Sequence, residues 1–251
     1  MRKRKIGAIA MISLAIGSGF GAANRASAQD VTGRYQQMAP LDQYLMANQA
    51  AEISLARSAA PASISGDAEV LVLGPHGFER AVKGTNGFVC LVARSWTSAP
   101  DADFWDPRVR VPMCFNPAAA RSYLQNYFKK TELVLAGRTK SQTLEAVVAA
   151  VDQDQLPAME PGAMCYMLSK DGFGGDSAPH WPPHLMFFYP QTNISAWGAN
   201  LPGSPVAGYE DRGEHLTSYV VVVRKWSDGT DGFATPPHTS APTTAGGHMH
   251  P

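Results

Sequence analysis

The chain has 251 residues, with 21 Lys and Arg, 21 Asp and Glu, and a formal net charge of zero. This length is sufficient for one domain with a sizeable hydrophobic core. No basic cluster occurs after the first five positions, which argues against a nucleic-acid-binding protein.

Residues 1–28 are typical of a secretory signal peptide. Residues 2–5 are all basic, residues 6–20 form an apolar run, and an Ala-Ser-Ala cleavage site follows at 26–28. The apolar run is short for a bilayer span of about 20 residues and contains three glycines, so an uncleaved membrane anchor is the less favoured alternative. We therefore expect a bacterial protein that is cleaved after Ala28, is periplasmic or secreted, and is not stably inserted in a membrane.

Removal of residues 1–28 leaves an acidic chain that keeps all three cysteines. The segment holds five basic and no acidic residues, so the remaining chain has 16 basic and 21 acidic residues and a net charge of −5. In an oxidising compartment we expect a disulfide between Cys90 and Cys114, which flank one strand–loop–strand passage, with Cys165 left over. The alternative is three buried thiols.

Composition and turn residues divide the rest of the chain into three parts. Residues 29–66 should form an N-terminal segment with one helix, which has Pro40 in its first turn and ends at Pro61. Residues 67–227 should form a globular domain. Residues 228–251 are rich in Gly, Pro, Thr and His, so we expect a disordered tail.

The first half of the globular domain is expected to be mainly extended. A strand is predicted at 69–73, and a hairpin should pair 78–83 with 88–96 across an Asn-Gly turn. Residues on both faces of 88–96 are apolar, so this strand should be central in the sheet. A further extended segment is predicted at 108–114.

Two helices and three strands are predicted in the second half. An Asn-Pro start predicts a helix over 116–130, and a capping box predicts another over 139–151. Strands are expected at 163–169, 185–189 and 218–226. The predicted fold is therefore a single α+β domain, with a mostly antiparallel sheet of about five to six strands and two to three helices packed on it.

The segment 170–205 is the candidate functional region because Gly and Pro are dense in it and long ordered loops are often functional. Its first part, 170–183, joins two strands that a two-residue turn could join. We expect His180 and Trp181 to be exposed on this loop, so that removing either side chain costs little stability. The candidate ligand-binding residues are His180, Trp181, His184, Asp171, Asp176, Trp197 and, from an earlier turn, His76.

The spacing of His180 and His184 does not predict a metal site. Pro182 and Pro183 prevent a helix, and in an extended chain the two imidazoles would lie about 12–13 Å apart. A metal shared through a sharp turn remains the minor alternative, with Asp171, Asp176 and His76 as further ligands.

No catalytic or cofactor motif identifies a reaction. The chain has no G-x-S-x-G or S-x-x-K nucleophile motif, no P-loop and no dinucleotide-binding fingerprint. The favoured hypothesis is a protein that binds a small molecule or an envelope protein through the 170–205 loop. The alternative is a periplasmic hydrolase that uses His180, His184 and the loop aspartates, directly or through a metal. The ligand, cofactors and oligomeric state are not assigned.

Overall fold

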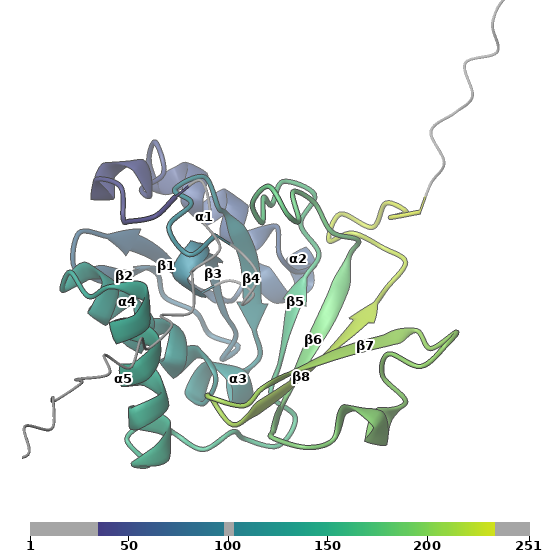
Figure 1. Ribbon diagram of the computed structural model, residues 1–251. Coiled ribbons are helices and arrows are strands. Elements are labelled where there is room, and N and C mark those ends of the chain that lie inside the picture. Colours follow the sequence, from purple (N-terminus) through teal and green to yellow (C-terminus); the bar gives the residue numbers. More distant parts are fainter. Residues whose placement is uncertain (1–34, 98–102, 234–251) are drawn as a thin grey trace, which may run out of the picture. The chain divides into compact units, whose positions relative to one another are not determined.

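The computed structural model describes residues 35–97 and 103–233, so the predicted signal peptide and its cleavage site lie outside the described residues (Figure 1). The described residues form one compact α+β unit, as predicted. Its single mixed sheet has eight strands instead of five to six, in the order β2-β1-β3-β4-β5-β6-β8-β7. Neighbouring strands are antiparallel except β1 and β3, which are parallel.

The strands are β1 (Glu69–Gly74), β2 (Gly77–Val82), β3 (Val89–Ala93), β4 (Val111–Phe115), β5 (Met164–Met167), β6 (His184–Pro190), β7 (Val206–Asp211) and β8 (Leu216–Val222). The α-helices in the described part of the chain are more numerous than predicted: α1 (Gln49–Arg57), α2 (Ala62–Ser65), α3 (Pro117–Arg121), α4 (Leu124–Leu135) and α5 (Lys140–Asp152). Three short 3-10 turns are η1 (Leu41–Gln43), η2 (Ser95–Thr97) and η3 (Ile194–Trp197).

The predicted hairpin between 78–83 and 88–96 is wrong. β2 pairs with β1 instead, through a tight turn in which Gly77 has a φ of 120°, a value that favours glycine. The chain then crosses back and places β3 on the other side of β1. The prediction that this strand is central is confirmed, since β3 lies between β1 and β4. The Asn-Gly pair at positions 86–87 therefore lies in the connection that crosses from β2 to β3, and it does not form a hairpin turn.

Helix boundaries also differ from the predictions where capping residues act inside a predicted helix. The N-terminal helix is divided, because Asn48 caps α1 by accepting a hydrogen bond from the Ala51 N–H at 2.8 Å, and Pro61 precedes the separate α2. The helix predicted over 116–130 is interrupted at Ser122, where the backbone leaves the helical region between α3 and α4. The capping box of α5 is confirmed at Thr139.

The last part of the chain is more ordered than predicted. β7 was not predicted, because it is a short edge strand whose Gly208 and terminal acidic residues are untypical of strands. Residues 228–233, which we assigned to the disordered tail, form a hydrogen-bonded turn in which Trp226 N–H donates to the Thr230 carbonyl at 3.0 Å. Residues 234–251 lie outside the described residues.

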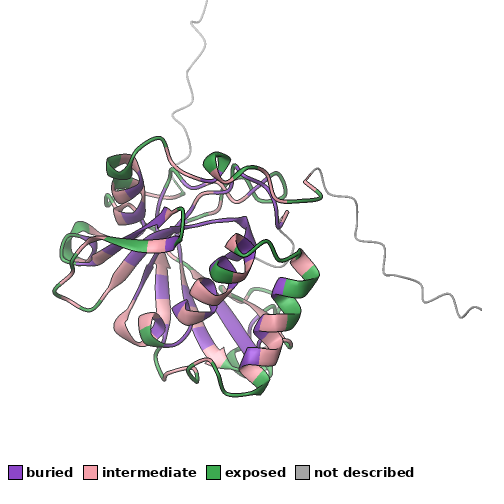
Figure 2. Ribbon diagram, turned by 90° about the vertical axis from the view of Figure 1, so that its left-hand side faces the viewer, coloured by how far each residue is buried: buried purple, intermediate pink, exposed green. Residues whose placement is uncertain are grey.

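Helices cover both faces of the sheet. Buried residues Val70, Cys90 and Val92 pack with α1 and α2 on one face. The larger core cluster, which includes Leu91, Phe115 and residues of α3 and α4, occupies the other face. Figure 2 shows buried residues concentrated on the strands of the sheet, with exposed residues on the outer parts of the helices and on the loops.

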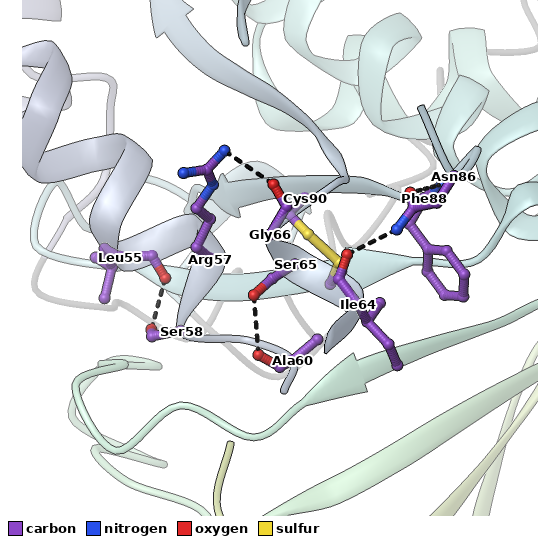
Figure 3. Close-up of a disulfide and its surroundings, with 11 residues drawn as sticks. Leu55, Arg57, Ser58, Ala60, Ile64, Ser65, Gly66, Asn86, Phe88 and Cys90 are labelled. Atoms are coloured by element: carbon purple, nitrogen blue, oxygen red, sulfur yellow. Dashed lines mark hydrogen bonds between the residues drawn. A yellow bond between two sulfur atoms is a disulfide. The ribbon is translucent and has the colours of Figure 1, made fainter. Parts of the chain in front are cut away.

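Cys90 and Cys114 form a disulfide, as predicted, and lie directly opposite each other in β3 and β4. Figure 3 shows the disulfide beside α2, where Asn86 donates a hydrogen bond to the Ile64 carbonyl oxygen. Cys165 is a buried free cysteine, and burial raises the pKa of its thiol. The disulfide is typical of a protein from an oxidising compartment. No helix in the described ranges is long and apolar enough to cross a membrane.

Candidate functional site

A cavity of about 490 Å³ lies on the face of the sheet that carries α4 and α5. Side chains alternate between the two faces of a strand, so Met186 of β6, Val220 of β8 and Tyr209 of β7 all reach the same cavity. Most of the wall is aromatic or aliphatic, and its volume falls within the range of about 300–1,000 Å³ that is usual for small-molecule sites.

Several elements contribute the other lining residues. These are Ala93, Ser95, Trp96, Thr97 and Phe104; Val111, Met113 and Met167; Tyr123, Tyr127 and Lys130; Lys140, Leu144 and Val148; Gly174, Ser177, Ala178, Trp181 and His184; and Asp211, Gly213, Glu214 and Leu216.

Buried polar contacts hold the β7–β8 hairpin against α4 beside the cavity. Lys130 Nζ lies 2.5 Å from Glu214 Oε1, and Asn126 Nδ2 donates to Glu214 Oε2 at 3.0 Å. A second contact joins the hairpin to the end of α5, where His215 Nε2 lies 2.8 Å from Asp152 Oδ1. The helices are thereby connected to the edge of the sheet, and the cavity occupies the space between them.

The 170–183 loop supplies another side of the cavity and is shaped around Trp181. A Cβ atom on Gly172 would lie 2.5 Å from the Trp181 ring, and one on Gly174 would lie 3.3 Å from it and 2.6 Å from the Ala178 carbonyl oxygen. Only glycine allows this close approach of the backbone to the indole. The loop is also attached to the residue that precedes β4, because Phe173 and Arg110 exchange backbone hydrogen bonds of 2.8 Å.

Of the seven candidate residues predicted from the sequence, the cavity brings together two, Trp181 and His184. His180 is exposed, as expected, with Nδ1 3.3 Å from the Gly172 carbonyl oxygen. The expectation of an exposed Trp181 is wrong, since its indole is partly buried and packs against the main core.

The remaining candidates lie away from the cavity lining. Asp171 and Asp176 are exposed, and Asp176 pairs with Arg108 at 2.8 Å. Trp197 stacks on Tyr219 with ring centres 4.4 Å apart, and the Tyr219 side chain leaves the sheet on the face opposite to the cavity. His76 is exposed in the β1–β2 turn. Across the described ranges, no group of three or more His, Cys, Asp or Glu side chains could hold a metal ion.

His184 is the buried titratable group at the loop side of the cavity. Its Nδ1 lies 2.9 Å from the Pro182 carbonyl oxygen, which can only accept a hydrogen bond, so Nδ1 carries the proton. Burial lowers the pKa of the imidazole below its usual value, which favours the neutral form. In that form Nε2 is an acceptor, and it has no hydrogen-bond partner within the described part of the protein.

The polar and aromatic residues on the helix side of the cavity were not predicted from the sequence. Burial raises the pKa values of Tyr123 and Tyr127 well above the usual value for tyrosine, so both phenols stay protonated at neutral pH. Tyr127 donates to Met113 Sδ at 3.4 Å. The apolar periodicity of α4 places Tyr127 on the buried side, but it does not distinguish a packed core from a cavity wall.

Replacement of two neighbouring loop residues should affect stability differently. We expect Trp181→Ala to lower the free energy of unfolding by about 2 kcal/mol, less than the 3–5 kcal/mol typical of a fully buried tryptophan, because the ring is only partly buried. His180→Ala should change it by no more than about 0.5 kcal/mol. Urea unfolding of both variants tests this, and equal effects would show that the indole does not support the loop.

Comparisons of the chain with protein-family models, with curated proteins and with solved structures found no match.

Proposed function

We propose that this is an exported bacterial protein that binds a small, largely apolar molecule in the cavity beside the 170–183 loop. The observation that carries this proposal is the cavity itself, which has about 490 Å³ of space and a mainly aromatic and aliphatic wall. A concave site of this size with a mainly apolar wall is the usual form of a small-molecule binding site.

Export is the second part of the proposal. The disulfide between Cys90 and Cys114 supports it, and so does the signal-peptide pattern of residues 1–28. A ligand site open to the periplasm or to the medium would receive its ligand from the environment of the cell.

The proposed site is narrower than the 170–205 region first considered. Residues after His184 run into β6 and then along the opposite face of the sheet, where Trp197 packs on Tyr219. The hydrolase alternative has less support than binding. Neither loop aspartate lines the cavity, and Asp176 is already engaged by Arg108, so His184 has no carboxylate from this loop to orient it.

Blocking the cavity tests the proposed function. The probe is N-phenyl-1-naphthylamine, a neutral apolar dye whose fluorescence rises when it leaves water. We expect the wild-type protein to bind it, and we expect Val220→Trp to weaken binding at least about tenfold, because the larger side chain extends from the sheet into the cavity.

The matched control is Val221→Trp. This residue follows Val220 in β8 and is also partly exposed, but its side chain leaves the sheet on the opposite face. The affinity of the Val221→Trp variant for the dye should equal that of the wild type. Absence of dye binding by the folded wild-type protein, or equal loss in the two variants, would contradict a site in this cavity.

A further inference from the structure

Two polar groups at the loop side of the cavity lack partners, and they are of opposite kinds. The indole N–H of Trp181 is buried and donates no hydrogen bond to any residue that the structure describes. Nearby, His184 presents Nε2 as an acceptor, because Nδ1 is committed to the Pro182 carbonyl oxygen. Both residues line the cavity, and their ring centres lie 6.5 Å apart in a perpendicular arrangement.

An unpaired buried donor or acceptor destabilises a folded protein, so most such groups are satisfied by a partner. Of the two groups here, the indole N–H of Trp181 is the buried one, and Nε2 of His184 is an accessible acceptor. The first needs an acceptor and the second a donor. A hydroxyl group meets both demands with one oxygen atom: its O–H donates to Nε2, and its lone pair accepts from the indole N–H.

We propose that the ligand of this cavity is an uncharged apolar molecule with a hydroxyl group, which is bound between His184 and Trp181. This inference rests on the proposed binding function and specifies its ligand class. A carboxylate fits this pair less well, because it offers no proton to the neutral imidazole. A pure hydrocarbon fits less well too, because it offers no acceptor to the buried indole N–H and would cover His184 Nε2 without donating to it.

The geometry of the loop supports this role for Trp181. Gly172 and Gly174 allow its ring to lie against the backbone, which holds the indole in one position beside the cavity. Pro182 and Pro183 restrict the chain between Trp181 and His184, so the two side chains are set in a fixed relation. A donor and an acceptor that are positioned in advance lose little conformational freedom when a hydroxyl binds.

Two probes of nearly equal size test the inference: 2-naphthol and 2-methylnaphthalene. They differ only in that a hydroxyl replaces a methyl group, and the methyl compound is the more hydrophobic. A purely apolar site would therefore bind 2-methylnaphthalene more tightly. We expect equilibrium dialysis with the full mature protein to show the reverse, with 2-naphthol bound at least about tenfold more tightly.

Trp181→Phe deletes the N–H group while keeping an aromatic ring on the loop. It should reduce the preference for 2-naphthol by about fivefold, the value of one neutral hydrogen bond. Trp197→Phe removes an indole N–H on the other face of the sheet and should leave the preference unchanged.

The outcomes separate this inference from the proposed function. If both probes bind but 2-methylnaphthalene binds equally well or better, the hydroxyl inference is overturned and the cavity remains an apolar site. If neither probe binds to the folded protein, the proposed function itself is overturned. An unchanged preference in folded Trp181→Phe would remove the indole from the site.

Discussion

Replacing Arg94 with methionine should lower the free energy of unfolding by about 3–5 kcal/mol, as is typical when one partner of a buried ion pair is removed. Arg94 is fully buried, and its Nη2 lies 2.8 Å from Glu52 Oε1, which is also buried. The guanidinium additionally donates to the carbonyl oxygen of Tyr44 at 2.7 Å and to that of Val92. The variant would leave the Glu52 carboxylate without its cation in the core.

The Arg94–Glu52 contact connects parts of the chain that are distant in sequence. Glu52 belongs to α1, Arg94 follows β3, and Glu52 Oε1 also accepts from the Leu73 N–H of β1 at 3.0 Å. The two side chains therefore neutralise each other's charge and also provide hydrogen-bond partners for buried backbone N–H and C=O groups. Because burial disfavours the charged form, it lowers the pKa of Arg94, while the negative charge of Glu52 opposes this shift.

A double-mutant cycle distinguishes the lost charge pairing from lost packing. The Arg94→Met and Glu52→Met double variant removes both buried charges, so it should recover part of the stability lost in Arg94→Met. Recovery should be incomplete because the backbone partners remain unsatisfied. Arg224→Met is the control, since Arg224 pairs with Asp231 at 2.7 Å on the surface and should contribute at most about 1 kcal/mol. Urea unfolding of the wild type, the two single core variants, the double variant and Arg224→Met provides the values. Strictly additive effects of the two core substitutions would show that the pair is not coupled.

Local signals in the sequence predicted the elements whose structure is decided locally. The capping box at Thr139 and the apolar runs of β5 and β6 identify their elements because neighbouring residues determine caps and strand propensity. The pairing of strands, in contrast, is not decided by neighbouring residues. Whether β2 joins β1 or β3 depends on which of two glycine-containing turns closes the hairpin, and both turns have suitable residues. The β7 edge strand is stabilised mainly by its neighbour β8, which local propensity does not record.

The candidate site was predictable only in its loop. Gly and Pro marked 170–183 as shaped, and this correctly drew attention to Trp181 and His184. The sequence could not show which loop residues turn inward, since Trp181 is placed by close contacts with Gly172 and Gly174. Lys130 and Glu214 were missed because they are 84 positions apart and look like ordinary surface charges until the fold brings them within 2.5 Å.

Removing the disulfide should have an effect of similar size to the loss of Arg94. Cys90 and Cys114 are separated by 24 positions, and on the chain-entropy account a cross-link that closes such a loop contributes about 3.5 kcal/mol by restricting the unfolded chain. The Cys90→Ala and Cys114→Ala double variant should therefore lose at least this amount. Both cysteines are fully buried, so a packing contribution adds to it.

The third cysteine provides the control for packing. Cys165 is also fully buried but is not cross-linked, so Cys165→Ala reports what the loss of one buried sulfur costs. Twice that value, subtracted from the effect of the double variant, leaves the contribution of the cross-link. A reductant should lower the unfolding midpoint of the wild type and of Cys165→Ala, and it should not affect the double variant. Thiol titration of the denatured, unreduced wild type should find one thiol. A titration that finds three, or a wild type whose stability is indifferent to reductant, would show that the two β-strands are not covalently linked in the protein as isolated.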